Sequence, residues 1–317
     1  MSKGKVTVLG SNGHLGNAAM VAFRDAGWQV TGLGRSNRRP VEHTRFIAGD
    51  ADDVAVVKAA IVDADVVVHG LHLRYDGWGN GRAEAQLQVV IDAMAGSGKT
   101  LLFPGTIYNY SAGDRIIGPD LRQRAEAKRG DIRIRLEQML KAAAEAGQFQ
   151  AIILRAGDFY GPGNRGEWFE QAMLMEHAKG RLYHLGDLDM RHCWAYLPDL
   201  GRAFAALGEQ RAQLAAFENR HFAGHWVTHR QVMTAIQQAA PAPLAVKPMP
   251  WWLLRALGLV NPVMRDIYRM RYLWRNEMEL TDPRLHALLG PDFATPFDVA
   301  VRVTVEELLG KAVKKAA

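Results

Sequence analysis

Short apolar runs alternate with longer amphipathic segments through the first half of the chain. The runs are rich in β-branched residues and predict six strands, at residues 5–9, 28–33, 45–48, 64–69, 100–104 and 150–155. Between them, apolar side chains recur at helical spacing in residues 15–26, 52–60, 83–95 and 132–146. This alternation predicts an α/β fold with a doubly wound parallel sheet, which binds its ligands at the carboxyl ends of the strands.

The pattern changes after residue 163, where Pro and Trp become more frequent and helical spacing dominates. Helix starts are marked by a capping box that opens at Thr228 and by Asp282, which is followed by proline. We expect a smaller, mostly helical lobe that covers the ligand edge of the sheet and takes the substrate. The expected parts are a first domain over 1–163, a return of the chain to it near 187–207, and the lobe over 164–317.

The segment Gly10-Ser11-Asn12-Gly13-His14-Leu15-Gly16 joins the first strand to the first helix. Gly10 allows a sharp turn, Gly13 allows close approach of a diphosphate, and Gly16 allows the helix to pack on the strand. The phosphates would then bind the unpaired N–H groups at the helix start. The alternative is a tight turn without a ligand.

Composition narrows the class of protein. The chain has 317 residues, is 48% hydrophobic and contains one cysteine, Cys193, which excludes an internal disulfide and a zinc site built on cysteines. We expect a cytoplasmic protein, because the N-terminus shows no signal-peptide pattern. Arg255 interrupts the longest apolar stretch, so we expect no membrane partner.

The net charge of +6 permits nucleic-acid binding, but the positive residues are scattered and we expect no nucleic-acid partner. Residues 251–275 are aromatic and basic, with five arginines and one aspartate. We expect a lid helix or a dimer helix there, and a membrane-surface helix is the alternative. Histidines recur at 221, 225 and 229. If residues 220–227 form a strand, His221 and His225 share a face but lie roughly 13 Å apart. No nearby carboxylate completes a metal site, so we expect no metal.

The glycine spacing Gly-x-x-Gly-x-x-Gly resembles that of the extended short-chain dehydrogenase/reductases, the NAD-dependent epimerase/dehydratase group. Other segments resemble this family in the same order along the chain: Gly49-Asp50, Asp65–Gly70, Arg155–Gly163 and Trp194–Leu200. The resemblance implies a Rossmann-type fold, an enzyme, a nicotinamide cofactor and a homodimer. It also implies cofactor contacts from the glycine segment, including Asn12, His14 and Leu15, and from Asp50, Gly70, Leu71 and Ala156.

The loop after the second strand bears on which nicotinamide cofactor is used. It carries Arg35 and Ser36 and has no carboxylate before Glu42. A guanidinium suits the 2′-phosphate of NADP, whereas NAD-specific sites place an acidic residue there. We expect NADP, with NAD as the second candidate; the alternative for the arginines is an ordinary solvated loop.

The resemblance fails at the usual catalytic residues. The family has Ser or Thr at the end of the fifth strand and Tyr-x-x-x-Lys on the next helix, where this chain places Pro104, Arg129 and Arg133. An arginine does not donate a proton near neutral pH, but Arg133 would still hold a ribose hydroxyl or an anionic substrate. The alternative is a pair of exposed arginines one helical turn apart.

Two functional hypotheses follow. In the first, the enzyme exchanges a hydride between the nicotinamide and a carbonyl or alcohol carbon of a small, acidic or sugar-like substrate. The second is a non-catalytic NADP-binding regulator or sensor. For the enzyme, the candidate catalytic residues are Thr106, Tyr108 and Arg133, with Lys128 as a base if it is desolvated, and the candidate substrate contacts are Trp78, Asp158 and Tyr160.

Overall fold

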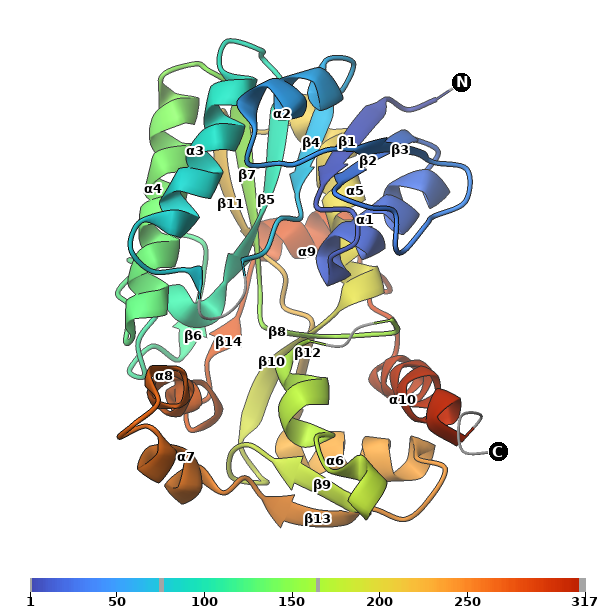
Figure 1. Cartoon of the computed structure of the whole chain (residues 1–317), viewed down its shortest axis with the longest axis vertical. Coiled ribbons are helices and arrows are strands. Elements are labelled where there is room, and N and C mark those ends of the chain that lie inside the picture. Colours follow the sequence, from blue (N-terminus) through green and yellow to red (C-terminus); the bar gives the residue numbers. More distant parts are fainter. Residues whose placement is uncertain (1, 74–76, 164–165, 314–317) are drawn as a thin grey trace.

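The first half of the chain forms the predicted parallel sheet in the upper lobe of Figure 1. The computed structural model describes residues 2–73, 77–163 and 166–313. The sheet has seven parallel strands in the order β11-β7-β5-β4-β1-β2-β3, so the chain reverses direction next to β1. The strands are β1 Lys5–Leu9, β2 Gln29–Gly34, β3 Arg45–Ala48, β4 Val66–His69, β5 Thr100–Thr106, β7 Gln150–Ala156 and β11 Phe217–His221.

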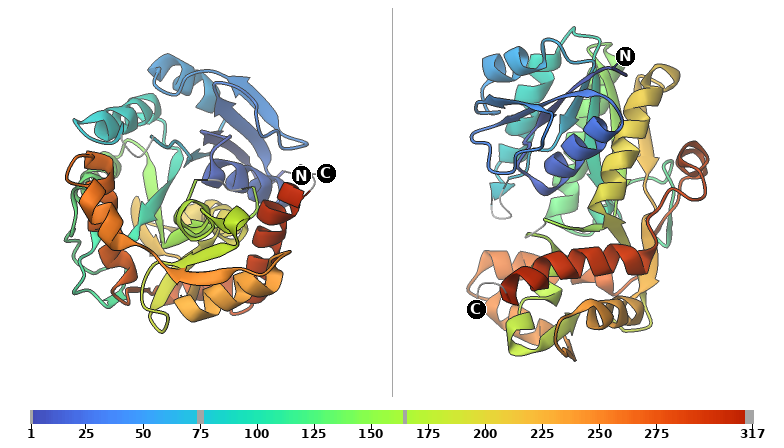
Figure 2. Two further views of the ribbon diagram at one scale, coloured as in Figure 1. Left: turned by 60° about the horizontal axis from the view of Figure 1, so that its bottom comes forward. Right: turned by 90° about the vertical axis from the view of Figure 1, so that its right-hand side faces the viewer.

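Helices cover both faces of this sheet, as Figure 2 shows. α1 and α5 pack on one face, and α2, α3 and α4 pack on the other. Their bounds are α1 His14–Asp25, α5 Leu197–Gln210, α2 Val54–Ile61, α3 Arg82–Met94 and α4 Lys128–Glu145. The predicted doubly wound parallel fold is therefore confirmed.

The lower lobe is built on two small sheets and a set of helices. One sheet has the order β12-β10-β8 and the other pairs β13 with β9. The strands are β8 Asp158–Tyr160, β9 Arg181–His184, β10 Arg191–Tyr196, β12 His225–Thr228 and β13 Ala245–Pro248. The helices of this half of the chain are α6 His229–Ala239, α7 Trp251–Leu257, α8 Pro262–Met270, α9 Pro283–Leu289 and α10 Phe297–Val313.

Short elements complete the connections between the two lobes. The strands β6 Ile116–Ile117 and β14 Glu279–Leu280 pair in parallel. The 3-10 turns are η2 Ile107–Asn109, η4 His177–Lys179, η5 Arg211–Gln213 and η6 Arg271–Trp274, and η3 Phe169–Met173 is a π-helical turn.

Both predicted helix starts form as expected. The Thr228 side chain accepts a hydrogen bond from the Gln231 N–H, and Gln231 completes the capping box. Asp282 caps α9 by accepting from two backbone N–H groups of its first turn. These caps satisfy N–H groups that the helix itself leaves unpaired.

The chain returns to the upper lobe with α5, which begins inside the segment predicted near 187–207. β10 belongs to the lower lobe, whereas α5 packs on α1 and β11 pairs with β7. A Cβ on Gly201 would lie 2.7 Å from the carbonyl oxygen of Ala18, so α5 and α1 pack closely. The predicted boundary after residue 163 adjoins residues 164–165, which lie outside the described part of the chain.

The strand considered for residues 220–227 is two strands in different sheets. β11 ends at His221 and β12 begins at His225, with Gly224 between them at a φ of 60°. A glycine in this left-handed conformation redirects the chain from one sheet to the other. His221 and His225 therefore share no strand face. Within the described residues, no helix is both long and apolar enough to span a bilayer.

Candidate active site

Glycines shape the turn between β1 and α1 by packing backbone against backbone. Gly10 has a φ of 77°, and a Cβ added there would lie 2.6 Å from the carbonyl oxygen of Gly70. A Cβ on Gly16 would lie 2.3 Å from the carbonyl oxygen of Gly10. Since such distances exclude any side chain, β1, α1 and the end of β4 meet through glycine alone.

The start of α1 suits an anion. Gly13 precedes the helix in extended conformation, and no described side chain caps it or places an acidic group in its first turn. The N–H groups of the first turn, including those of Leu15 and Gly16, therefore have neither an intrahelical partner nor a side-chain cap. The glycine packing and this helix start fit the diphosphate of a dinucleotide.

Asn12 connects the glycine turn to the loop after β2. Its side-chain amide donates to the carbonyl of Ser36, and its Oδ1 accepts from the N–H groups of Arg38 and Arg39 at 2.8 and 3.0 Å. The side chains of Arg35 and Ser36 are exposed. This network fixes the basic loop beside the turn, which is the placement that the expected 2′-phosphate contact requires.

Further expected cofactor residues lie at the carboxyl edge of the same sheet. Asp50 follows β3, is exposed, and accepts a hydrogen bond from the N–H of Asp52 at 3.2 Å. Leu71 is half-buried beyond β4. Ala156 ends β7, is 1% exposed and pairs in register with Thr106 of β5. Parallel strands bring these positions to one edge because all their carboxyl ends point the same way.

His14 connects the glycine turn to the lower lobe. Its Nδ1 lies 3.0 Å from a carboxylate oxygen of Glu167, and a Cβ on Gly166 would lie 2.7 Å from its ring. Glu167 precedes η3, whose residue Glu170 is half-buried. Burial raises the pKa of Glu170 to about 7, with a smaller contribution from Glu167. The lower lobe thus contributes carboxylates beside the start of α1.

The end of β5 packs directly against the start of α4. Thr106 Oγ1 accepts a hydrogen bond from the N–H of Tyr108 at 3.3 Å. A Cβ on Gly130 would lie 2.0 Å from the carbonyl oxygen of Tyr108, so only glycine allows this approach. The Arg133 guanidinium donates to the carbonyl of Pro104. The contact places Arg133 at the strand end, where the aligned family motif has its lysine.

Arg129 and Arg133 are 7% and 8% exposed, so the alternative of two exposed arginines is wrong. Their guanidinium carbons lie 5.5 and 5.9 Å from the centre of the Trp78 ring, and Arg133 also lies 4.8 Å from the centre of Phe103. Burial lowers the pKa of Arg133 to about 10, which keeps it cationic at neutral pH. The Trp78 Nε1 donates to the carbonyl of Leu73 at 3.0 Å, which helps to hold the indole ring beside the arginines.

A buried ion pair that was not predicted braces this site. Arg155 and Glu137 are 2.7 Å apart and almost fully buried. Arg155 also donates to the carbonyl of Thr106 at 2.6 Å and to Nε2 of His221 at 3.1 Å. The His221 Nδ1 bonds to the carbonyl of Ile117 at 2.9 Å, which leaves Nε2 free to accept. The pair thus ties β5, α4, β7 and β11 together behind Thr106.

Comparison with known families decides the identity of the fold. The model of the NAD dependent epimerase/dehydratase family matches residues 6–219, which include the glycine turn, the strand edge and α4. The chain belongs to this family. The expected family, Rossmann-type fold and enzyme class are confirmed.

Solved epimerase structures cover almost the whole chain. The UDP-glucose 4-epimerase of Brucella ovis in complex with NAD is 16% identical, with a TM-score of 0.75 over 95% of this chain and 97% of that one. The UDP-glucuronic acid 4-epimerase of Bacillus cereus, with UDP-glucuronic acid and NAD, is 14% identical, with a TM-score of 0.75 over 99% and 100%.

The Bordetella bronchiseptica enzyme WbmH in complex with NAD+ is 16% identical, with a TM-score of 0.71 over 96% of this chain and 98% of that one. At these identities the likeness concerns the fold alone. No curated protein matches the sequence.

Within this family member, Asp158 takes part in the packing of the lower lobe. It is 5% exposed, and its Oδ2 accepts from Nε2 of His192 at 2.9 Å and from Nε1 of Trp274 at 3.0 Å. Tyr160 is 0% exposed and its hydroxyl lies 2.8 Å from Nδ1 of His225. The structure therefore does not bring the Tyr160 side chain to the ligand edge, and its hydroxyl is engaged within the lower lobe.

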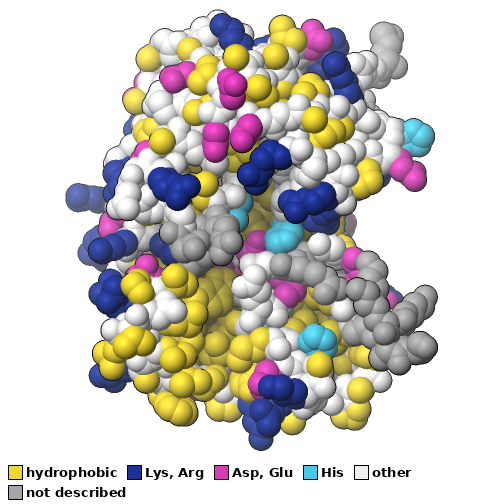
Figure 3. Space-filling model, viewed as in Figure 1, with side chains coloured by type: hydrophobic (Ala, Val, Ile, Leu, Met, Phe, Trp, Pro, Cys, Tyr) yellow, Lys and Arg dark blue, Asp and Glu magenta, His cyan; other side chains and the backbone are white. Residues whose placement is uncertain are grey.

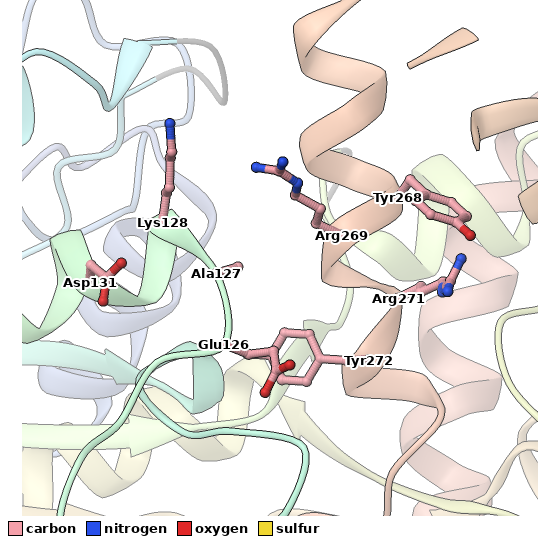
Figure 4. A pocket seen from close by; sticks show the side chains of 8 residues that line it. All are labelled: Glu126, Ala127, Lys128, Asp131, Tyr268, Arg269, Arg271 and Tyr272. Atoms are coloured by element: carbon pink, nitrogen blue, oxygen red, sulfur yellow. The ribbon is translucent and has the colours of Figure 1, made fainter. Parts of the chain in front are cut away.

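A cleft of about 480 Å³ opens between the start of α4 and the lower lobe (Figure 4). Lys128 of α4 and Arg269 of α8 stand on opposite walls, and Glu126 and Tyr272 appear below them in the view. Lys128 is exposed, which removes the condition under which it was a candidate base. No local sequence pattern indicates this cleft, because its two walls lie far apart along the chain.

The remaining cysteine and histidine signals are structural. The Cys193 thiol donates to the carbonyl of Met278 at 3.3 Å and accepts from the N–H of Leu280, and burial raises its pKa to about 12. Among residues 2–73, 77–163 and 166–313, no group of three or more His, Cys, Asp or Glu side chains is arranged to hold a metal ion.

Proposed function

We propose that this enzyme is an NADP-preferring oxidoreductase or epimerase. Its reaction would exchange a hydride between the nicotinamide and a carbonyl or alcohol carbon of a small, acidic or sugar-like substrate. The observation that carries the proposal is the glycine packing, in which a Cβ on Gly16 would lie 2.3 Å from the carbonyl oxygen of Gly10. Next to that packing, the first turn of α1 has unpaired backbone N–H groups. A diphosphate binds such groups in folds of this type.

The dinucleotide, when bound, supplies the hydride chemistry. The chain's own residues bind and orient it: the glycine turn takes the diphosphate, and the Arg35 side chain takes the 2′-phosphate. NAD is the second candidate, because the titles of the neighbouring structures name NAD. The proposed contacts are Gly10, Asn12, Gly13, His14, Leu15, Gly16, Arg35, Ser36, Asp50, Gly70, Leu71, Arg133 and Ala156.

Thr106, Tyr108 and Arg133 are the proposed catalytic group. The Thr106 hydroxyl accepts from a backbone N–H, so its own proton remains available for a substrate oxygen. Tyr108 is half-buried and close enough to Arg133 to interact electrostatically with it. Since a neighbouring cation stabilises a phenolate, Tyr108 is suited to carry the proton, and Arg133 holds anionic or hydroxyl groups without titrating.

The cleft between α4 and α8 supports an anionic substrate. Lys128, Arg269 and Arg271 contribute cations to its lining, against the carboxylates of Glu126 and Asp131. The cation-stacked face of Trp78 and the partly engaged carboxylate of Asp158 are the other proposed substrate contacts. Homodimerisation through helices that flank the sheet remains part of the proposal.

The second candidate function is a non-catalytic NADP-binding regulator. The observation in its favour is that arginines occupy the positions where the family motif has its tyrosine and lysine, and that both are buried. A regulator would bind the cofactor without turnover.

A fluorescence titration with NADPH and NADH tests the proposed function. We expect wild-type protein to bind NADPH more tightly. Arg35→Ala should weaken NADPH binding by tenfold or more, on the order of 1.4 kcal/mol, and leave NADH binding unchanged. Arg302→Ala removes an equally exposed arginine on α10 and is the matched control.

Three outcomes would change the proposal. Equal losses for NADPH and NADH in Arg35→Ala would remove the assigned 2′-phosphate contact. Tight binding without any loss of reduced nicotinamide absorbance, over a panel of carbonyl compounds and nucleotide sugars, would favour the regulator. No binding of either cofactor would exclude both functions.

A further inference from the structure

The hairpin of α7 and α8 exposes apolar side chains to an extent found nowhere else in the described chain. Trp252 is 73% exposed, Leu259 is 83% exposed and Val260 is 84% exposed. Leu253 and Leu257 on α7 are also exposed. These five side chains, with the arginines of residues 251–275, form what we call the hairpin surface. Figure 3 shows it as the apolar area at the lower left, where Figure 1 places α7 and α8.

The fold does not need this surface for its own packing. The inner face of the hairpin is already packed against the rest of the lower lobe. Trp251 is buried and stacks on Trp274, with 5.7 Å between the ring centres. Its Nε1 donates to the carbonyl of Leu185 at 2.8 Å. Met270, at the end of α8, is 1% exposed. A lid helix packed on the upper lobe would bury these apolar side chains, so the structure does not contain the expected lid, whereas a dimer helix stays a prediction.

The tip of the hairpin has a well-bonded backbone. The N–H of Leu259 bonds to the carbonyl of Ala256, and the N–H of Val260 bonds to the carbonyl of Leu257. Asn261 caps α8 by accepting from the N–H groups of its first turn at 2.9 and 3.3 Å. Because these N–H groups already have partners, moving the tip into an apolar medium adds no cost for unsatisfied donors there.

The same segment is rich in cations, two of which, Arg269 and Arg271, also line the cleft between α4 and α8. The surface carries Arg255, Arg265, Arg269, Arg271 and Arg275, against a single Asp266. None of these arginines forms an ion pair within the part of the chain that the structure describes. Burial, and after it the charges of Arg275 and Arg255, lower the pKa of Arg271, whose guanidinium carbon also lies 3.9 Å from the centre of the Tyr268 ring.

We propose that the hairpin surface docks this protein on the surface of an anionic lipid bilayer. The exposed tryptophan and aliphatic side chains suit the boundary between headgroups and acyl chains, and the arginines suit phosphate headgroups. A second copy of the chain is a poorer occupant. A two-fold interface through this surface would bring two net charges of +4 against each other.

Vesicle co-sedimentation with the full chain tests the proposal. Vesicles of phosphatidylcholine alone are compared with vesicles of equal parts phosphatidylcholine and phosphatidylglycerol. We expect binding to the mixed vesicles, little binding to the neutral ones, and release as salt is raised.

Variants separate the apolar and the charged parts of the surface. The triple variant Trp252→Ser, Leu259→Ser, Val260→Ser should lose binding at least tenfold and keep its melting temperature, because these side chains are exposed. Val62→Ser removes a 68% exposed side chain from a distant helix end and is the matched control. Arg255→Gln with Arg265→Gln should weaken binding roughly twenty-fold, at about fivefold per charge, with Arg302→Gln as its control.

Several results would overturn the proposal. Wild-type protein that pellets with neither vesicle type, or equally with both, contradicts it, and so does a triple variant that binds as wild type. Sedimentation velocity without lipid, showing a dimer that the triple variant dissociates, would assign the surface to self-association instead. The wild-type lipid comparison stands even if a variant fails to fold.

Discussion

The glycine turn between β1 and α1 depends on contacts between single backbone atoms. The carbonyl oxygen of Gly10 fills the space that a side chain on Gly16 would need, and the carbonyl of Gly70 does the same for Gly10. The backbone packing therefore leaves no room for a Cβ atom at Gly10 or Gly16. This part of the site was predictable from sequence, because a turn between strand and helix is a local property of a few neighbouring residues.

A methyl group at this point should remove the site. Gly16→Ala would place its Cβ 2.3 Å from the Gly10 oxygen, so the turn must shift. We expect NADPH affinity to fall at least tenfold and the free energy of unfolding to fall by about 1–3 kcal/mol. Fluorescence titration and denaturant unfolding measure the two effects.

Gly310→Ala is the control for this variant, since nothing lies within 4 Å of the added methyl in that helix. It should leave NADPH affinity unchanged. Normal NADPH binding by Gly16→Ala would show that the turn does not hold the diphosphate.

The environment of the arginines was not predictable in the same way. Alignment placed Arg133 opposite the family's lysine, and the bond to the carbonyl of Pro104 agrees with that position. Its burial depends on Trp78, which comes from a different loop and carries no sequence signal for this contact. The Arg155–Glu137 pair was missed for the same reason, since its meaning depends on three-dimensional packing.

At the scale of elements, local signals predicted caps and strands but not where the chain changes sheets. The caps at Thr228 and Asp282 act through neighbouring residues and were found. The break between β11 and β12 depends on which sheet each strand pairs with. The sequence pattern of residues 220–227 was therefore equally consistent with one continuous strand. The π-helical turn η3 likewise has no simple sequence signature.

Glu170 in η3 should make stability depend on pH. Its carboxyl group has a pKa of about 7 in the folded protein and about 4.5 when unfolded. Between these values the folded state keeps a proton that the unfolded state has lost, so stability falls as pH rises. We expect Glu170→Gln to flatten the dependence of melting temperature on pH in this range. At neutral pH the gain in stability is at most about 3 kcal/mol.

Glu306→Gln is the comparison for this measurement, because Glu306 is exposed on α10. Its pH profile should follow wild type. An unchanged slope in Glu170→Gln would assign the effect to another group.

At the scale of the whole molecule, the order of the strands could be narrowed down from the sequence, but the contact between the two lobes could not. Alternating strands and helices with right-handed crossovers leave few arrangements for a parallel sheet. The cleft, by contrast, pairs α4 with α8 across the lobes, and no local pattern indicates which helices will face each other.

Acid should destabilise both lobes together. His69, His221 and His229 are buried, and desolvation lowers the pKa of each to about 3. As pH falls from about 6.5 towards 3, the unfolded chain gains protons that the folded protein excludes, so stability is lost. The combined loss reaches the order of 10 kcal/mol, which matches the stability of a typical domain.

An acid titration followed by tryptophan fluorescence measures this loss. His229→Leu should move the unfolding midpoint to lower pH, since His229 is 0% exposed and its ring nitrogens have no hydrogen-bond partner among the described residues. His286→Leu, at an exposed position, should not move it. Equal midpoints for wild type and His229→Leu would show that this histidine does not govern the acid transition.

The return of the chain to the upper lobe constrains how such a protein can evolve. α5 and β11 complete the upper lobe, yet in the sequence they lie between segments of the lower lobe. A single genetic crossover therefore cannot exchange one complete lobe between two such proteins, because no single cut in the sequence separates the upper lobe from the lower lobe. New substrate specificities in this architecture must arise by point substitution and loop change, with both lobes inherited together.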